Sequence, residues 1–372
     1  MKNAVTFIGL MSGTSMDSID TVAVTFSNKN LNLLGTHAHA IPANVKANIL
    51  TLCAPGLDNV QLLAETDHRL GELFAEASLA LITQLNLSSK DIVAIGSHGQ
   101  TIRHQPPGLK PGFSLQIGNP NQIAARTGCS VIADFRRKDM AYGGQGAPLV
   151  PAFHREIFHH PGKTRIIVNI GGISNITILE ASGDCHGFDT GPGNILLDAW
   201  SKKHTNENYD DKGRWGATGS SSDALLTQLK THNFFDRRGP KSTGREDFNL
   251  DWLEEQTRLF EIAPVDIQTT LALYTAETIA ASIADLAKPI DEIFVCGGGI
   301  HNLDLIQKLN ESLLKRMMPA IQSTAVIGLD PNWVEACAFA WLAKQRIDLQ
   351  PGNVPAVTGA SQQTILGCIY LP

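Results

Sequence analysis

The residues with the clearest chemical potential lie in glycine-containing turns of the sequence. The first turn is "MSGTSMDSID", residues 11–20, where an apolar run ends in small hydroxyl residues and two carboxylates. Glycine lets a backbone approach a ligand closely, and successive N–H groups in such a turn can bind an anion. The pattern therefore predicts a phosphate site formed by Ser12, Gly13, Thr14, Ser15, Met16, Asp17, Ser18 and Asp20.

The carboxylate of Asp17 gives this turn a second possible ligand. Asp17 cannot contact a phosphate directly because both groups are negative, but it can hold the water shell of Mg²⁺. The alternative is an ordinary turn, since turns favour Asp and Ser. The chain after the turn alternates like a strand, and G-x-x-x-x-G-K-[ST] and G-x-G-x-x-G are both missing, which excludes P-loop and Rossmann sites.

Two further turns carry related chemistry. "NIGGISN" again separates two strand-like runs and offers amide and hydroxyl donors without a carboxylate, from Gly171, Gly172, Ser174 and Asn175. In "GFDTGPGN" Asp189 precedes a turn and a helical segment, whose free N–H groups and dipole suit phosphate, with Gly191, Gly193 and Asn194 at its start. An aspartate there can deprotonate an attacking oxygen or hold a metal. The alternatives are a tight hairpin and an aspartate that caps its own turn.

The last group combines a glycine turn with two polar clusters. Gly297, Gly298 and Gly299 follow a strand-like run and permit close approach of a ring or phosphate, or simply form a tight strand-to-helix turn. His98, Gln100 and Thr101 favour hydrogen bonding to a polyhydroxyl ligand over a metal, because His104 adds no third ligand at a recognisable spacing. Asp134 and Arg136 can grip a sugar hydroxyl and a carboxylate, or form an ion pair between two lobes.

The elements that must position these residues alternate between strand-like and helical patterns. Apolar runs at residues 6–11, 21–26, 92–98, 130–135, 164–172, 175–179 and 292–299 predict strands, and one-sided apolar periodicity predicts helices at residues 59–85, 266–287 and 303–318. This alternation predicts an α/β protein. The hairpins at residues 6–26 and 164–179 share one plan, which suggests two lobes of related design, and we expect a boundary near residue 130, giving lobes 1–130 and 131–372.

Bulk properties exclude several classes of protein. The 372 residues carry a net charge of -6 without a long basic stripe, so neither nucleic acid nor an anionic membrane is an expected partner. The six cysteines form no C-x-x-C pair and predict reduced thiols. No apolar run is as long as a signal peptide or a membrane span requires. We therefore expect a cytoplasmic protein.

Nine motifs, in order from residue 11 to residue 367, give the chain a close resemblance to anhydro-N-acetylmuramic acid kinases. They are "MSGTSMDSID", "GSHGQTIRH", "QIGNP", "IADFRRKDMAYGGQGAPLVP", "NIGGISN", "GFDTGPGN", "DKGRWGATG", "VCGGGIHN" and "VTGASQQTILG". Met16 and Ser18 vary the first turn, where other members of the family tend to carry Leu and Gly. The resemblance covers nearly the whole chain and is far more specific than any single motif.

The resemblance implies the two-lobed actin, hexokinase and heat-shock chaperone fold (ribonuclease H-like), with ATP phosphates between two hairpin turns in an interlobe cleft. It implies that Ser12 to Asp20 and Gly171 to Asn175 are those turns, and that Gly297 to Gly299 support the adenosine end. It implies that Asp189 is a general base that activates water to attack C1 of 1,6-anhydro-N-acetylmuramic acid, after which O6 takes the γ-phosphoryl group. The "SHGQT" and "DFR" segments and Glu335 are then sugar contacts, and a homodimer is plausible.

Two other classes of function remain as alternatives on the same fold. An ATP-driven conformational machine, such as a chaperone or a filament protein, would need a peptide-binding region or nucleotide-dependent polymerisation. A phosphohydrolase would release phosphate from ATP without sugar, whereas the ADP production of a kinase depends on the sugar.

Overall fold

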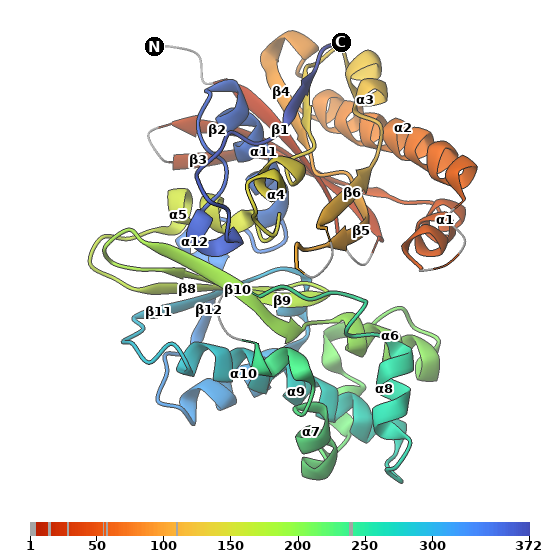
Figure 1. Ribbon diagram of the computed structural model, residues 1–372, viewed down its shortest axis with the longest axis vertical. Helices are drawn as coiled ribbons and strands as arrows, with labels where there is room; N and C mark the ends of the chain where they lie inside the picture. Colours follow the sequence, from red (N-terminus) through yellow and green to blue (C-terminus); the bar gives the residue numbers. More distant parts are fainter. Residues whose placement is uncertain are drawn as a thin grey trace. The chain divides into compact units, whose positions relative to one another are not determined.

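The chain forms two compact units. The computed structural model describes residues 5–13, 16–27, 30–54, 56, 59–108, 111–237 and 241–372 (Figure 1). Unit 1 comprises Met1–Ile157 and Trp333–Pro372, and unit 2 comprises Phe158–Asn332.

These units differ from the expected lobes 1–130 and 131–372. β7 (Val131–Ala133) pairs in parallel with β4 (Ile92–Ser97), so the chain stays in unit 1 beyond residue 130. The C-terminal helix α11 (Val334–Ile347) returns to unit 1 and packs on β1 (Thr6–Ser12) and β4. Neither a long-range parallel pairing nor a returning helix leaves a mark on local composition, which is why the sequence placed the boundary too early.

Unit 1 is built on a six-stranded sheet with the order β13-β7-β4-β1-β2-β3. Antiparallel pairing joins β1, β2 (Ser18–Ser27) and β3 (Asn30–Ala40), whereas β4 runs parallel to β1 and β7 parallel to β4. β13 (Cys368–Tyr370) closes the edge against β7. The carboxyl ends of β1, β4 and β7 therefore lie at the same edge of the sheet.

Unit 2 repeats this plan in a five-stranded sheet with the order β10-β9-β8-β11-β12. β8 (Arg165–Ile170), β9 (Ile173–Leu179) and β10 (Cys185–Pro192) form the antiparallel part, and β11 (Glu292–Cys296) and β12 (Ile321–Ser323) continue it in parallel. Counted along the chain within each sheet, the first five strands of both sheets thus have the spatial order third, second, first, fourth, fifth. This confirms the related design of the two halves and the α/β fold class.

Both faces of the unit 1 sheet are covered by helices. Successive residues of a strand point to opposite faces, so neighbouring residues of β1 contact different helices. Ile8 and Leu10 of β1 belong to a core with residues of α1 (Ala43–Cys53), α2 (Val60–Gln84) and α3 (Pro120–Thr127). Gly9 lies opposite Gly96 of β4 and faces α11. A Cβ at Gly9 would lie 1.9 Å from the Ala336 carbonyl oxygen, so this close approach of the helix requires glycine.

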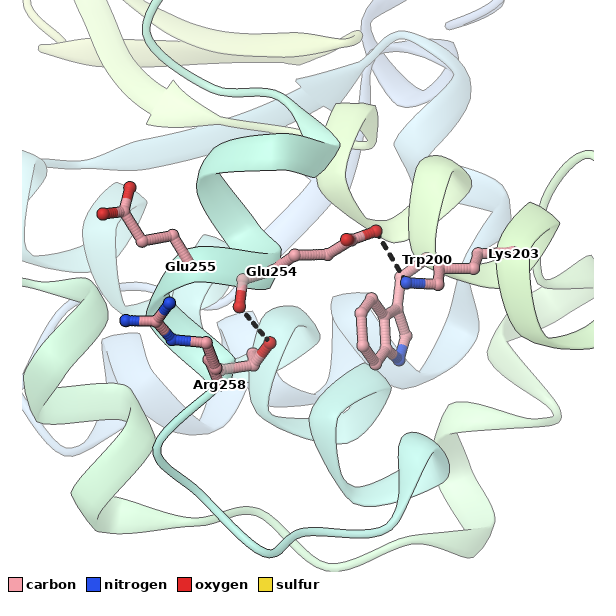
Figure 2. Close-up of a pocket in the computed structure, with 6 residues that line it drawn as sticks. Trp200, Lys203, Glu254, Glu255 and Arg258 are labelled. Carbon is pink, nitrogen blue, oxygen red and sulfur yellow. Dashed lines mark hydrogen bonds and ion pairs between the residues drawn. The ribbon is translucent and has the colours of Figure 1, made fainter.

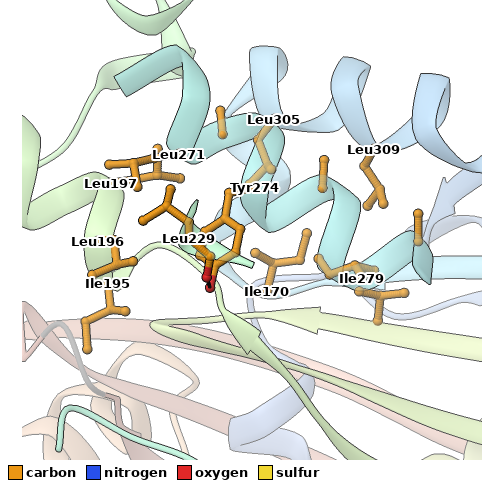
Figure 3. Packing of buried hydrophobic residues seen from close by; sticks show 14 of the residues in the cluster. Ile170, Ile195, Leu196, Leu197, Leu229, Leu271, Tyr274, Ile279, Leu305 and Leu309 are labelled. Atoms are coloured by element: carbon orange, nitrogen blue, oxygen red, sulfur yellow. Dashed lines mark hydrogen bonds between the residues drawn. The ribbon is translucent and has the colours of Figure 1, made fainter. Parts of the chain in front are cut away.

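The core of unit 2 lies between its sheet and the helices on one face. Figure 3 shows Ile170 of β8 near side chains from α6 (Ile195–Thr205), α9 (Pro264–Ala284) and α10 (Leu303–Leu314). Tyr274 is fully buried among them, and its hydroxyl donates to the Leu229 carbonyl oxygen at 3.1 Å. The predicted helices at 59–85, 266–287 and 303–318 are confirmed as α2, α9 and α10, although α10 ends at Leu314.

The other elements are short. They are β5 (Gln100–Gln105), β6 (Phe113–Ile117), α4 (Arg137–Ala141), α5 (Val150–Phe158), α7 (Asp223–Leu229), α8 (Leu250–Thr257), α12 (Pro355–Thr358) and the 3₁₀ turns η1 (Ser89–Asp91), η2 (Asp211–Gly213), η3 (Gly216–Thr218), η4 (Asn233–Asp236), η5 (Gly298–His301) and η6 (Thr324–Ile327). Among the described residues, no helix combines the length and the apolar character that crossing a bilayer requires.

Candidate functional site

Unit 1 gathers predicted sugar contacts at the carboxyl ends of its parallel strands, where open α/β sheets commonly bind ligands. We call Ser12, His98, Gln100 and Arg136 the strand-end cluster. Ser12 Oγ donates to Gln100 Oε1 at 2.6 Å, and the Arg136 guanidinium donates to His98 Nε2 at 2.8 Å. Residues from three separate sequence motifs therefore meet in one unit.

The electrostatics of this cluster keep its imidazole neutral. Burial, and secondly the charge of Arg136, hold the pKa of His98 well below its ordinary value. Because Nε2 accepts from Arg136, the ring proton of His98 is on Nδ1. The same two causes lower the pKa of His104 to about 4, and its Nδ1 lies 3.0 Å from Ser114 Oγ. Both rings are thus uncharged at neutral pH and suit hydrogen bonding. Within the described ranges, no three His, Cys, Asp or Glu side chains are grouped to hold a metal.

The other predicted sugar contacts have protein partners of their own. Thr101 Oγ1 accepts from Gln116 Nε2 at 3.1 Å. Asp134 is clamped by Arg137, with 2.7 Å between Arg137 Nε and Asp134 Oδ1. This ion pair lies within unit 1, so it is not the pair between two lobes that the sequence left open. Glu335 occupies the first turn of α11.

The first turn connects β1 to β2, as the hairpin pattern predicted. The Met16 amide donates to the Gly13 carbonyl oxygen at 3.3 Å, and Met16 has a positive φ of 55°. The Met16 side chain is buried in the core and the Ser12 hydroxyl is bound to Gln100, so the side chains of these two residues are directed inward. Thr14 and Ser15, the other predicted hydroxyl donors, lie outside the described residues.

The two carboxylates of this turn differ in environment. Asp17 is half exposed and its Oδ1 lies 2.6 Å from Lys46 Nζ. Burial raises the pKa of Asp20, although a hydrogen bond from Ser18 Oγ at 2.8 Å acts in the opposite direction. A cation beside Asp20 would offset the cost of burying its charge, so this carboxylate fits a magnesium ion. Lys46 already neutralises part of the charge of Asp17.

The second turn, between β8 and β9, is held by the start of α6. The Asn194 amide donates to the Gly171 carbonyl oxygen at 2.8 Å, and the amides of Gly193 and Ile195 donate to Gly172 at 2.8 and 3.0 Å. The expectation that the amides at this helix start are available to phosphate is therefore wrong for these three residues. They instead fix the carbonyl groups of the turn.

This contact has a consequence for the amides of the second turn. The C=O and the N–H of one trans peptide point in opposite directions. Because the carbonyls of Gly171 and Gly172 point at α6, the N–H groups of Gly172 and Ile173 point away from it. Two successive amides directed to the same side can bind an anion. The approach depends on Gly193, where a Cβ would lie 2.3 Å from the Gly171 carbonyl oxygen.

Polar side chains near the second turn divide into two sets. Ser174 is fully buried, and its Oγ lies 2.5 Å from Thr190 Oγ1, so it stabilises the hairpin from inside. Asn175 pairs directly with Asn169 on one side and with Asp189 on the other. Directly paired residues share a face of the sheet. Asn169, Asn175 and Asp189 therefore form a polar row across three strands.

Asp189 lies at an irregularity of strand β10. The register shifts between Asp189 and Gly191, which marks a β-bulge, a device that redirects side chains and is frequent near active sites. Asp189 is only 8% exposed. Its Oδ2 accepts from the Thr243 amide at 2.9 Å, and its own amide donates to the Lys241 carbonyl oxygen at 3.0 Å. A carboxylate oriented in this way is suited to act as a general base.

Thr243 and its neighbours are functional candidates that the sequence analysis missed. Thr243 Oγ1 donates to Asp247 Oδ2 at 2.7 Å, which helps fix the segment beside Asp189. Thr243 lies 54 residues from Asp189 in the chain. The only available signal was the glycine-containing polar stretch "KSTGRED", residues 241–247.

The three glycines after β11 have different roles. Gly297 has φ 84° and ψ 169°, and a Cβ there would lie 2.3 Å from Asn169 Oδ1. A Cβ at Gly299 would lie 2.2 Å from Ile170 Cγ2. Gly298 is exposed and has open space where a Cβ would be. Gly297 and Gly299 thus serve packing, and Gly298 leaves a surface open to a ligand.

A cavity elsewhere in unit 2 does not coincide with these residues. It measures about 490 Å³ and lies between α6 and α8 (Figure 2). Its lining is largely charged, with Lys203 Nζ 2.6 Å from Glu254 Oε1. It is lined by Trp200, Lys203, Glu254, Glu255, Thr257 and Arg258, none of which is a predicted site residue.

Comparison with known proteins decides the family. A family model described as "Anhydro-N-acetylmuramic acid kinase" matches residues 5–372. A protein of that name from Shewanella sp. (strain MR-4) is 50% identical over 369 residues, which cover 98% of each chain. Another from Aliivibrio fischeri is 49% identical over 365 residues, again 98% of each chain.

The chain belongs to the anhydro-N-acetylmuramic acid kinase family. This confirms the resemblance that the nine motifs gave. In this family context, the strand-end cluster and the Asp189 row are the natural candidates for sugar binding and catalysis.

Two solved structures show a distant similarity to the chain. Component A of (R)-2-hydroxyglutaryl-CoA dehydratase from Acidaminococcus fermentans has a TM-score of 0.45 and 10% identity, covering 91% of this chain and 96% of that chain. A ROK hexokinase from Thermus thermophilus has a TM-score of 0.39 and 15% identity, covering 91% and 100%. Neither bears on the roles of individual residues.

Proposed function

We propose that this chain opens the 1,6-anhydro ring of 1,6-anhydro-N-acetylmuramic acid hydrolytically and phosphorylates O6. The products are N-acetylmuramic acid 6-phosphate and ADP. The observation that carries the proposal is identity of about half, over 98% of both chains, to relatives named for this kinase activity. The sugar comes from the cell wall, so the reaction belongs to peptidoglycan recycling.

Asp189 is the general base of the proposed reaction. It takes a proton from water as the water oxygen bonds to C1, and the C1–O6 bond breaks. O6 keeps that electron pair and attacks the γ-phosphorus of ATP, from which ADP leaves. The Thr243 amide supports this role because it orients the carboxylate of Asp189. A carboxylate that activates water at an anomeric carbon is also the device of inverting glycoside hydrolases.

The sugar is proposed to contact residues of unit 1. The neutral ring of His98 and the amide of Gln100 suit hydroxyl and acetamido groups, and Arg136 adds a cation for a carboxylate. Thr101, Asp134 and Glu335 complete the proposed contacts. Of these, Asp134 requires its Arg137 partner to shift or to share its carboxylate oxygens.

ATP is proposed to bind through backbone groups more than through side chains. Residues 12–20 and 171–175 contribute turns, and the directed amides of Gly172 and Ile173 support phosphate binding at the second. Ser174, Gly191, Gly193 and Asn194 act indirectly, by shaping that turn. The open surface above Gly298 takes the adenosine end, with Gly297 and Gly299 as its support.

A magnesium ion is proposed to accompany ATP near Asp17 and Asp20. When bound, it neutralises phosphate charge, which is a main requirement of phosphoryl transfer. Asp20 supports this assignment because it is a largely buried carboxylate. Asp17 contributes through water in exchange for part of its contact with Lys46. We also propose a homodimer, and a cytoplasmic location because ATP is the phosphate donor.

The test is to incubate the protein with 1,6-anhydro-N-acetylmuramic acid and Mg-ATP and to analyse the sugar by mass spectrometry. We expect a product heavier than the substrate by one water and one phosphoryl group. Unchanged sugar with folded protein would contradict the proposal. Phosphate release without sugar would instead favour a phosphohydrolase, and nucleotide-dependent light scattering would favour a filament protein.

A further inference from the structure

We propose that Asp139 is a positioning residue that acts on sugar binding through Arg136, an inference that rests on the proposed function. Asp139 belongs to α4 and is fully buried. Its Oδ2 accepts from the Gly146 amide at 2.9 Å, and its Oδ1 accepts from Asn353 Nδ2 at 2.7 Å and Thr358 Oγ1 at 2.8 Å. Burying a carboxylate costs desolvation energy, and hydrogen bonds from three donors offset that cost because bonds to a charged acceptor are strong.

The connection to Arg136 passes through Gly146. Arg136 Nη1 donates to the Gly146 carbonyl oxygen at 2.8 Å, while the amide of the same residue is held by Asp139. Arg136 Nη2 donates to His98 Nε2. The guanidinium is therefore aimed by two acceptors, and Asp139 fixes the position of one of them.

The loop between Asp139 and Gly146 is shaped to reach this carboxylate. Gly144 lies so close that a Cβ there would be 2.2 Å from Asp139 Oδ2. Gly146 has a positive φ of 72°, which glycine adopts without strain. These contacts give the "YGGQG" part of the fourth motif a physical purpose, which is to wrap the loop around Asp139.

The same carboxylate secures the C-terminal segment. Asn353 donates to Asp139 and at the same time accepts from the Thr364 amide at 2.8 Å. The Gln145 amide donates to the Thr358 carbonyl oxygen at 2.7 Å, so the loop and this segment also contact directly. Asp139 thus joins two separate sequence motifs behind the strand-end cluster. Full burial excludes direct contact with the sugar, which makes it a positioning residue.

Asp139→Asn tests the inference because it keeps the shape but places a donor group where three donors already converge. We expect the KM for the anhydro sugar to rise on the order of tenfold, the loss typical of a hydrogen bond to a charged group, with the KM for ATP unchanged. Thr358→Val is the matched control. It removes one donor to Oδ1 but leaves Gly146 held, so it should lower stability while the sugar KM stays within about twofold.

A double-mutant cycle separates positioning from general loss of structure. If Asp139 acts through Arg136, Asp139→Asn should have little further effect on the sugar KM in an Arg136→Gln background, since coupled residues are not additive. Additive effects, an unchanged KM in Asp139→Asn, or an equal rise in Thr358→Val would each overturn the inference.

Two further outcomes are distinguishable. Wild-type protein that does not convert the anhydro sugar contradicts the proposed function and this inference together, whereas normal wild-type turnover with an unaffected Asp139→Asn variant contradicts the inference alone. If Asp139→Asn is not recovered folded, Gly144→Ala perturbs the same carboxylate from the loop side. It should show the same selective rise in sugar KM, and a normal KM would overturn the inference.

Discussion

The glycine turn after β11 offers a prediction in which three neighbouring substitutions of the same kind have different results. Gly297→Ala and Gly299→Ala should destabilise the protein, whereas Gly298→Ala should leave it stable but weaken ATP binding. The reason is that a methyl group meets packed atoms at the outer two positions and open space at the middle one.

The magnitudes follow from the local geometry. At Gly297, φ 84° and ψ 169° form a conformation open essentially to glycine alone, and strain of this kind costs about 1–3 kcal/mol. The methyl group would also lie 2.3 Å from Asn169 Oδ1, and overpacking costs about 1–3 kcal/mol more. The sum is about 2–6 kcal/mol, a large part of the roughly 5–15 kcal/mol by which proteins are stable.

Gly299→Ala lacks the dihedral strain, because its φ is not positive. Its methyl group would lie 2.2 Å from Cγ2 of Ile170, which is fully buried and cannot easily move. We therefore expect only the overpacking cost of about 1–3 kcal/mol. Gly298→Ala should be neutral or stabilise by up to about 1 kcal/mol, because alanine restricts the unfolded chain.

The assay combines urea unfolding with measurement of the KM for ATP. If the adenosine end lies against Gly298, a methyl group there should cost about 1–3 kcal/mol of binding, or roughly 5- to 150-fold in KM. An unchanged ATP KM in Gly298→Ala would refute the nucleotide assignment. Wild-type stability in Gly297→Ala would refute the packing argument.

Three further predictions concern catalysis, pH and the second turn. Asp189→Asn should retain ATP binding but lose about 10²- to 10⁴-fold in kcat, the usual contribution of a general base. The control Asp184→Asn, at an exposed position, should keep the wild-type kcat. Full activity of Asp189→Asn would remove Asp189 from this role. The pKa of His104 is about 4 when folded and 6.5 otherwise, so the unfolded chain binds more protons and stability should fall as pH drops from about 6.5 towards 4. Urea unfolding should show this slope reduced in His104→Gln but not in His68→Gln, which alters an exposed ring; equal slopes in all three proteins would contradict it. Gly193→Ala should raise the ATP KM, because a methyl group 2.3 Å from a carbonyl oxygen of the second turn must displace that turn, and a normal KM would count against phosphate binding there.

Residue patterns within a short segment predicted the helices and hairpins whose burial follows from that segment alone. The helix at residues 59–85 has a continuous apolar stripe and appears as α2, and the hairpins around both predicted phosphate turns are present. β3 was not predicted, because "THAHA" lacks the apolar alternation of a half-buried strand. β3 is a strand because it pairs along β2, and its own residues do not predict this pairing.

The candidate site was predicted by residue type better than by contact. Glycine turns, Asp189 and the polar clusters could be proposed from the sequence because their residue types suggest chemistry, and their roles stay predictions. The amides at the start of α6 were expected to face a phosphate, yet those of Gly193, Asn194 and Ile195 are bound to the second turn. Roles for Thr243 and Asp139 could not be assigned from the sequence, because their hydrogen-bond partners lie far away in the chain.

We propose that this protein couples opening of an anhydro sugar to phosphoryl transfer from ATP. The most direct measurement is ADP release by the wild-type protein with Mg-ATP, with and without 1,6-anhydro-N-acetylmuramic acid, alongside the phosphorylated sugar formed. We predict one ADP for each phosphosugar, and negligible ADP when the sugar is left out. ADP release that is as fast without the sugar, or that yields no phosphosugar, would contradict this coupling.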